Sequence, residues 1–262
     1  MHSPQDTRPV VVLLHSSLSS RSQWSALMAA HEAEYRFIAI DLLGYGKSAF
    51  PTEAAQAGYT LAHEADAVAA ALAAQLEAGE PFHLVGHSYG GATALRLARQ
   101  MRQRVLSLAV FEPVAFHLLD AADPARVHIE QVVAAMQAAD GAEAAARIFI
   151  DYWNRPGVFD SLPEVQRQRF SSGIAKVMLD FKALLGEPAT LADMGQLDLP
   201  ALVLAGQQGT SSTRRVAEQL AAALPDARFA LAPGGHMAPI THAADVNALL
   251  VEFLQGAEQL SA

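Results

Sequence analysis

Short, continuous apolar runs alternate with amphipathic stretches along most of this 262-residue chain. This alternation limits the possible folds more than any other feature. A run that is apolar at nearly every position is typical of a β-strand buried on both faces. The intervening stretches, such as 61–76 and 246–253, keep their apolar residues on one helical face. The pattern predicts a parallel sheet with right-handed crossovers and helices on both sides. The predicted strands are 10–14, 36–40, 82–85, 105–111, 201–205 and 228–232.

Residues 116–196 interrupt this alternation. No strand-like run of similar strength occurs there, and three helical faces take its place. We therefore expect a core domain made of residues 1–115 and 197–262, with a helical cap inserted between the fourth and fifth strands at 116–196. The three faces are Ile129/Val132/Val133/Met136, Ala145/Ile148/Phe149/Tyr152 and Phe170/Ile174/Val177/Met178/Phe181.

Charge and composition exclude several classes of partner. The net charge is −9 and the basic residues form no run, which argues against nucleic acid or an anionic membrane. There is no cysteine and no clustered His/Asp/Glu spacing, so we expect no disulfide, metal or cofactor. The first nine residues are polar, and the apolar run 10–14 is too short for a signal peptide or a membrane span. A soluble, cytoplasmic protein that binds a small apolar molecule is expected, with a homodimer left open.

The segment "FHLVGHSYGGATALRLA" (82–98) contains the pattern G-x-S-x-G between an apolar strand and a helix. A sharp strand-to-helix turn strains the serine backbone, and the small residues two positions before and after Ser88 let strand and helix pass closely. The N–H groups at the start of the helix then point toward an anion beside Ser88. We predict Ser88 as a nucleophile; the alternative is a glycine-rich turn with an incidental serine.

A general base is expected in the loop after the last strand. In "FALAPGGHMAPITH" (229–242), two glycines precede His236 and let the loop bend toward the carboxyl edge of the sheet. We predict His236 as this base; the alternative is a surface histidine in a flexible turn. His242, beside the final helix, is expected to be a surface or capping residue.

An oxyanion hole needs two preorganised N–H donors. The backbone N–H of Tyr89 follows the nucleophile and is the first. The backbone of Ser17, in the loop after the first strand, is expected to supply the second, with Ser16 as the second choice. His15 in the same loop is expected to brace it by hydrogen bonds, although His15 and Ser16 are also candidate substrate contacts.

Four segments together resemble the successive signatures of the α/β-hydrolase fold family: "LLHSSLSSRSQW", "AIDLLGYGKS", "LVGHSYGGATAL" and "PGGHMAPITH". The resemblance implies a three-layer α/β sandwich with a mostly parallel sheet, a helical cap and a Ser–acid–His triad. Typical members have an eight-stranded core, but His15 comes so early in this chain that the family's first two strands have almost no room, so we expect a trimmed sheet of about six strands. The chain departs from the family pattern further at His15-Ser16, where His-Gly is usual. In the family, the acid of the second segment usually pins the adjoining loop, so Asp41 is expected to be structural. His87 is the variable position of the turn and is assigned no catalytic role.

The family's usual position for the acid, after the penultimate strand, holds Gln207, Gln208 and Gly209 instead. Asp198 and Asp226 precede their strands and so lie at the wrong end of the sheet. Glu112 follows the strand after the nucleophile helix, where some α/β-hydrolases carry their acid, and it keeps the family order of serine, acid, histidine. We predict Glu112 as the triad acid. The alternatives are a glutamate that accepts loop N–H groups, or a histidine with no acid at all.

The substrate site is expected under the cap. Among the cap aromatics we take Phe116 and Trp153 as candidate contacts, and 151–159, with its Pro-Gly break, as the stretch facing the cleft. The predicted enzyme is a carboxylic ester hydrolase or a related serine hydrolase acting on a small-to-medium apolar carbonyl substrate. An acyltransferase or perhydrolase would use the same residues, and a non-catalytic ligand-binding protein is the alternative of another class. A serine at position 88 argues against a dehalogenase, which would use aspartate.

Overall fold

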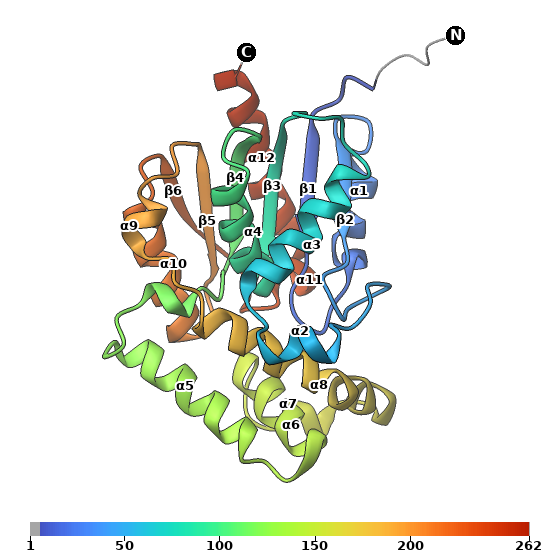
Figure 1. The fold of residues 1–262 in the computed structure, drawn as a ribbon, viewed down its shortest axis with the longest axis vertical. Helices are drawn as coiled ribbons and strands as arrows, with labels where there is room; N and C mark the ends of the chain where they lie inside the picture. The colour runs from blue at the N-terminus through green and yellow to red at the C-terminus, as the bar shows by residue number, and fades with distance from the viewer. Residues whose placement is uncertain (1–5, 262) are drawn as a thin grey trace.

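A parallel sheet of six strands forms the centre of the computed structural model, which describes residues 6–261 (Figure 1). The spatial order is β2-β1-β3-β4-β5-β6, and every neighbouring pair is parallel. This confirms the predicted six-stranded core. The strands are β1 (Val10–Leu14), β2 (Arg36–Ile40), β3 (Phe82–His87), β4 (Val105–Phe111), β5 (Ala201–Gly206) and β6 (Ala227–Ala232).

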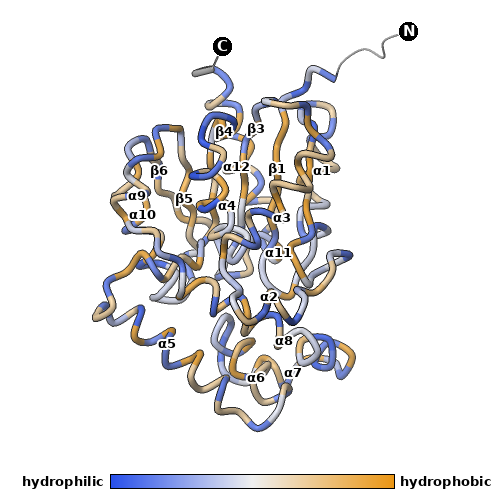
Figure 2. The backbone as a smooth tube through the Cα atoms, viewed as in Figure 1, coloured by the Kyte–Doolittle hydropathy of each residue, from blue (hydrophilic) through white to orange (hydrophobic). Residues whose placement is uncertain are grey.

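Both faces of the sheet are covered by helices, because side chains alternate between the two faces along each strand. On β1, Val10, Val12 and Leu14 join one apolar cluster, whereas Val11 and Leu13 join the other. The strand is correspondingly hydrophobic along its length in Figure 2. The first cluster is closed by α3 (Leu61–Ala73), α4 (Tyr89–Gln100) and α10 (Ser211–Ala223), and the second by α1 (Ser25–His31) and α12 (Ala243–Ser261).

The last strand differs from the prediction that each apolar run is buried on both faces. β6 is an edge strand, and its Phe229 and Leu231 are 38% and 42% exposed. The central strands β1, β3 and β5 are buried at every position. A run of apolar residues does not by itself reveal whether a strand has a neighbour on each side.

Most of the cap segment, residues 116–196, lies at the end of the sheet where the strands terminate, whereas its last helix, α9 (Leu191–Met194), packs beside α10 at the flank of the sheet (Figure 1). The three predicted helical faces fall on α5, α6 and α8, whereas the short α7 and α9 were not predicted. The described residues of this segment contain no strand. Its elements are η2 (Phe116–Leu118), α5 (Pro124–Gln137), α6 (Gly141–Trp153), α7 (Val158–Ser161), α8 (Glu164–Leu185) and α9 (Leu191–Met194).

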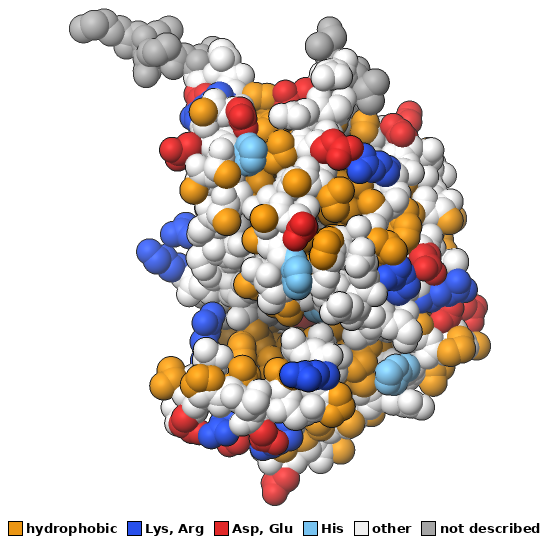
Figure 3. All heavy atoms as spheres, turned by 180° about the vertical axis from the view of Figure 1, so that it is seen from behind, with side chains coloured by type: hydrophobic (Ala, Val, Ile, Leu, Met, Phe, Trp, Pro, Cys, Tyr) orange, Lys and Arg blue, Asp and Glu red, His pale blue; other side chains and the backbone are white. Residues whose placement is uncertain are grey.

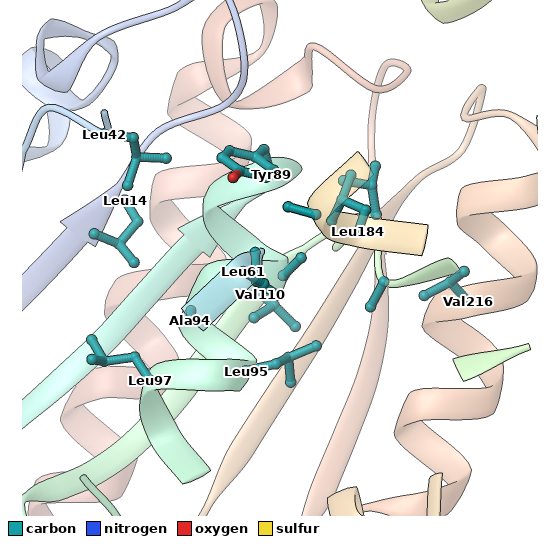
Figure 4. Close-up of a cluster of buried hydrophobic side chains, with 14 of the residues drawn as sticks. Leu14, Leu42, Leu61, Tyr89, Ala94, Leu95, Leu97, Val110, Leu184 and Val216 are labelled. Atoms are coloured by element: carbon teal, nitrogen blue, oxygen red, sulfur yellow. The ribbon is translucent and has the colours of Figure 1, made fainter. Parts of the chain in front are cut away.

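Helix α8 packs directly on the core of the sheet layer. Leu184 of α8 belongs to the same apolar cluster as Leu95 of α4 and Val110 of β4 (Figure 4). The remaining helices are η1 (Arg21–Trp24), α2 (Glu53–Ala57) and α11 (Ala238–Thr241). Within residues 6–261, no helix combines the length and the apolar character needed to cross a membrane.

The strand order fixes the place where a ligand site can form. The chain moves outward from β1 to β2 and then returns to β3 on the other side of β1, so the loops after β1 and β3 leave the sheet in opposite directions. In open α/β sheets, ligands bind in the crevice at such a point, outside the carboxyl ends of the strands. The loops that carry Ser17 and Ser88 both begin there.

Candidate active site

Ser88 lies on a sharp turn between β3 and α4, with backbone angles φ 55° and ψ −119°. This is the strained conformation expected of the turn. A Cβ atom at Gly86 would lie 2.4 Å from the carbonyl oxygen of Gly90. A Cβ atom at Gly90 would lie 2.5 Å from the carbonyl oxygens of Leu14 and His15. Glycine at these positions therefore lets the strand, the helix and the loop after β1 approach one another around Ser88.

His236 follows β6 and reaches back over the carboxyl edge of the sheet. Gly234, with φ 86°, lets the loop turn. The His236 Nε2 atom lies 2.9 Å from Ser88 Oγ, and its Nδ1 atom lies 2.7 Å from Glu112 Oε2. The three side chains are 3%, 5% and 0% exposed for His236, Ser88 and Glu112 respectively. The structure therefore brings the three predicted residues together in one hydrogen-bonded chain.

Strand β5 holds Glu112 through both its backbone and its side chain. Its backbone N–H donates to Leu204 of β5, and its Oε1 atom accepts the backbone N–H of Gly206 at 2.9 Å. A Cβ atom at Gly209 would lie 1.9 Å from Glu112 Oε1. The loop after β5, which has no acid of its own, therefore makes room for the carboxylate that comes from β4.

In the loop after β1, the two candidates for the second oxyanion donor, Ser16 and Ser17, differ in their hydrogen-bond partners. The N–H and Oγ of Ser16 both donate to Gln23 Oε1, at 3.2 and 3.0 Å. No acceptor within the described residues pairs with the N–H of Ser17 or of Tyr89. Leu18, the next residue, has φ 58°, so the loop bends sharply at this point. Ser17 and Tyr89 therefore remain the candidate oxyanion donors, whereas Ser16 is engaged by Gln23.

A cavity of about 740 Å³ lies above Ser88 and His236, between the sheet layer and the cap segment. Seen from behind, the surface is hollowed here and hydrophobic side chains lie in the hollow (Figure 3). Polar residues of the loop after β1, including Ser16, Ser17 and Gln23, form one side. The apolar side is formed by Phe149, Ile150, Trp153, Val158, Leu162, Phe170, Met237, Pro239 and Ile240.

Two candidate substrate contacts do not line this cavity. His15 is fully buried, with Nδ1 2.7 Å from the carbonyl oxygen of Ser16 and Nε2 accepting the N–H of Leu42 at 3.0 Å. Burial lowers the pKa of His15 to about 4, so it braces the loop as a neutral ring. Phe116 is also fully buried and packs in the apolar core. The prediction of these two as substrate contacts is therefore wrong.

Trp153 lines the cavity and stacks on the imidazole of His236. The ring centroids are 4.1 Å apart and the planes differ by 22°. The indole therefore covers one face of the imidazole at the wall of the cavity. Asn154 and Val158 line the cavity as well, which agrees with the expectation that 151–159 faces the cleft.

His87 was assigned no role from the sequence, yet it contacts the backbone of His236. Its Nε2 atom lies 2.8 Å from the carbonyl oxygen of His236, and the two rings are 5.2 Å apart. Burial, and then the neighbouring His236, hold the pKa of His87 well below its usual range. A neutral His87 donates from Nε2 and helps to hold the His236 loop. The pattern G-x-S-x-G leaves this position variable, so it carried no signal.

Asp41 holds the loop after β2, as the resemblance implied. Its two carboxylate oxygens accept the backbone N–H groups of Arg21 and Lys47, at 2.7 and 3.0 Å. A Cβ atom at Gly46 would lie 2.2 Å from the Asp41 carboxyl group, so glycine is required there. In the part of the chain that the structure describes, no group of three His, Asp or Glu side chains could hold a metal ion.

Comparisons with known proteins give a consistent family. A family model described as "alpha/beta hydrolase fold" matches residues 9–243. The chain is 32% identical to a Variovorax paradoxus protein named "Putative carbamate hydrolase RutD", with 97% of this chain and 94% of that protein covered. It is 27% identical to the pimeloyl-(acyl-carrier protein) methyl ester esterase of Chromobacterium violaceum, with 94% of each covered.

Solved structures show the same fold. A hydrolase from Pseudomonas aeruginosa PA01 superposes with a TM-score of 0.75, covering 96% of this chain and 92% of that one at 24% identity. At this level of identity the likeness concerns the fold alone.

Proposed function

The chain belongs to the α/β-hydrolase fold family, and on this premise we propose that it is a serine hydrolase that cleaves an apolar ester or a related carbonyl substrate. The observation that carries the proposal is the buried chain of hydrogen bonds from Ser88 through His236 to Glu112. Relatives named as hydrolases support hydrolysis in general. The serine nucleophile, the acid and the substrate class are proposed from the geometry.

Ser88 Oγ attacks the substrate carbonyl carbon while His236 Nε2 takes the hydroxyl proton. Glu112 accepts the His236 Nδ1–H, which fixes the tautomer and stabilises the imidazolium. The tetrahedral oxyanion accepts hydrogen bonds from the backbone N–H groups of Tyr89 and Ser17. Collapse expels the alcohol, which receives the proton from His236, and leaves an acyl-Ser88. A water that loses its proton to His236 then attacks the acyl carbon. Collapse of this second tetrahedral intermediate releases the carboxylic acid, and His236 returns the proton to Ser88 Oγ.

The cavity supports a small-to-medium substrate with an apolar acyl or aryl group. Its volume of about 740 Å³ lies in the range of small-molecule sites. Residues of α6, α7 and α8 supply much of its apolar wall, including Phe149, Val158 and Phe170. If these side chains close over a bound substrate, they would keep bulk water away from the acyl-enzyme. The hydrolytic water would still reach the acyl carbon at Ser88. Two full-length relatives are named for carbamate and methyl ester hydrolysis, which supports cleavage of an acyl–heteroatom bond.

The proposal is tested with a fluorophosphonate probe and a series of p-nitrophenyl esters of increasing chain length. We expect wild-type protein to be labelled and Ser88→Ala to be neither labelled nor active. Glu112→Gln should lower kcat by roughly 10⁴-fold, because the amide cannot stabilise the imidazolium. Glu187→Gln is the matched control: Glu187 is also buried, but it pairs with Arg96 away from the site.

A folded wild-type protein that resists the probe yet binds apolar ligands would support the non-catalytic alternative instead. Near-wild-type turnover in a folded Glu112→Gln variant would remove Glu112 from the triad while leaving Ser88 and His236 in place.

A further inference from the structure

A cluster of buried charges lies between helix α8 and the sheet layer, outside the hydrogen-bonded chain of the proposed mechanism. Lys176 and Asp180 of α8 are each 1% exposed, and Glu64 of α3 is 0% exposed. Lys176 Nζ donates to Asp180 Oδ1 and, at 3.3 Å, to Glu64 Oε2. We call these three residues the buried charge cluster. Burying ions costs several kcal/mol each before their mutual attraction offsets it, so the cluster is not explained by stability alone.

Lys176 is enclosed by aromatic faces as well as by carboxylates. Its ammonium lies 4.8, 5.2 and 4.7 Å from the ring centroids of Tyr45, Tyr59 and Tyr89. Cation–π contacts of this kind are stronger away from water. The cap segment therefore places a cation among three tyrosines, one of which directly follows the nucleophile.

The first link from the cluster leads to one oxyanion donor. Asp180 Oδ2 accepts the hydroxyl of Ser17 at 2.6 Å and the hydroxyl of Tyr45 at 2.5 Å. Ser17 is the residue whose N–H we propose as the second donor. Its position along the loop is therefore fixed by a side chain of the cap segment.

The second link leads to the other donor. Glu64 Oε2 accepts the hydroxyl of Tyr89 at 3.0 Å and that of Tyr59 at 2.5 Å, and Glu64 Oε1 accepts the N–H of Leu43 at 2.7 Å. Tyr89 supplies the first oxyanion N–H. Since Lys176 joins Glu64 to Asp180, one buried network holds the side chains of both residues whose N–H groups would bind the oxyanion.

A third contact from the same helix meets the loop beside Ser17. Gly173 of α8 faces Leu18, and a Cβ atom at Gly173 would lie 2.4 Å from Leu18 Cδ2. Leu18 is one of few non-glycine residues with positive φ. Helix α8 thus contacts two successive residues of the loop, one through a charge and one through close packing.

We propose that helix α8 of the cap segment supports the oxyanion hole, with Asp180 and Lys176 as positioning residues that set the N–H of Ser17 relative to the N–H of Tyr89. This inference rests on the proposed function. The cap segment then contributes to the rate of the reaction as well as enclosing the substrate, because the distance between the two donors decides how well they fit an oxyanion rather than a ground-state carbonyl.

The test measures whether substitutions of Ser17 and Asp180 lower kcat or instead raise KM. Ser17→Ala removes the hydroxyl and keeps the backbone N–H, whereas Ser17→Thr restores a hydroxyl. We expect Ser17→Ala and Asp180→Asn to lower kcat about 10- to 100-fold with KM changed by less than about threefold, as for misplaced donors. Ser17→Thr should recover most of the lost rate. Lys182→Met is the matched control on α8, because Lys182 is exposed and its ammonium donates to the backbone carbonyls of residues 56 and 57.

A trifluoromethyl ketone with the acyl chain of the best ester gives a second readout. It forms an oxyanion on Ser88, so its inhibition constant should rise about as much as kcat falls. The corresponding methyl ketone, which does not mimic the oxyanion well, should bind the variants as it binds wild type. Thermal melting establishes that each variant is folded; should Asp180→Asn unfold, Ser17→Ala and Ser17→Thr decide the question.

The two proposals fail in different ways. If wild-type protein neither reacts with the fluorophosphonate nor hydrolyses esters, the proposed function is wrong. If wild-type protein is active and Ser88→Ala is not, but folded Ser17→Ala keeps its kcat or loses activity through KM alone, the positioning role of α8 is wrong. An equal loss in Lys182→Met would also overturn it, since any perturbation of the helix would then suffice.

Discussion

Three single residues carry unusual backbone angles, and all three lie at the candidate site. Within residues 6–261, the non-glycine residues with positive φ are Leu18, Ser88 and Glu112. They lie in the loop after β1, at the turn between β3 and α4, and directly after β4. Such conformations cost on the order of 1–3 kcal/mol each and persist where the surrounding structure enforces them. Because all three strained residues lie at one site, the folded protein loses some stability in order to orient these side chains. Such strain is common at functional sites.

Gly209 allows a residue-scale prediction about the acid. A Cβ atom at Gly209 would overlap Glu112 Oε1, so Gly209→Ala must displace the carboxylate from His236. We expect kcat to fall by more than 10²-fold with a loss of stability of no more than about 1–3 kcal/mol, because only one buried group moves. The measurement is steady-state kinetics together with thermal melting.

Gly58→Ala is the control for this substitution, since a Cβ atom at Gly58 meets nothing within 4 Å. It should leave kcat unchanged. Full activity in Gly209→Ala would mean that the carboxylate is free to move without consequence, and Glu112 would lose its place in the mechanism.

At the scale of elements, the sequence predicted the features that depend on residues close together in the chain, such as turns and strand ends. Glycine spacing around Ser88 and His236 requires tight turns, and strand–helix alternation places those turns on one edge of the sheet. Glu112 could be found because it ends a strand at that same edge. Helix α8 was predicted from its apolar face, but Lys176 and Asp180 lie off that face and look like a surface i, i+4 pair. Their burial depends on contacts with residues more than 100 positions away, such as Ser17, which no periodicity reveals.

The contact between α8 and the loop after β1 leads to a prediction for Gly173. Within a helix, Gly→Ala is worth up to about 1 kcal/mol of stability where space permits. At Gly173 the new methyl group must push Leu18 aside, beside Ser17. We expect Gly173→Ala to keep or slightly raise the melting temperature while kcat falls about tenfold through the displaced loop.

Gly256→Ala on α12 is the matched change, because Gly256 is exposed and its Cβ would meet nothing within 4 Å. It should gain stability without any change in kcat. Wild-type kcat in Gly173→Ala would show that the loop tolerates movement of Leu18, and the coupling of α8 to catalysis would then rest on Asp180 alone.

At the scale of the whole molecule, the topology explains why distant segments meet. The reversal of strand order between β1 and β3 opens a crevice, and the loops after β1, β3, β4 and β6 all end at it. The cap segment joins β4 to β5, and residues of its helices α6, α7 and α8 line the cavity at that crevice. Residues of the loop after β1 and of helices α6, α7 and α8 therefore line one cavity, and the buried charge cluster joins α8 to α3.

The buried histidines determine how the stability of the whole molecule depends on pH. Burial lowers the pKa of His15 and of His83 to about 4, and burial together with the neighbouring His236 holds the pKa of His87 well below its usual range. In the unfolded chain these groups bind protons below about pH 6.5, whereas in the folded protein they stay neutral. The unfolded state therefore binds more protons, and the free energy of unfolding falls as the pH drops from about 6.5 to 4. His15 and His83 each contribute on the order of 3 kcal/mol to the total loss.

His83 allows this pH dependence of the unfolding free energy to be tested away from the active site. Its Nδ1 atom lies 2.7 Å from Ser107 Oγ, and both residues belong to strands of the sheet. His83→Gln keeps a group that can hydrogen-bond Ser107 but cannot titrate. Urea unfolding at pH 7.5, 6, 5 and 4.5 should show a shallower decline than in wild type, while His128→Gln, at an exposed histidine, should follow the wild-type curve. If His83→Gln declines as steeply as wild type, His83 either charges in the folded protein without cost or opens locally before unfolding. Either result would mean that this part of the sheet is wetter than its 1% exposure implies.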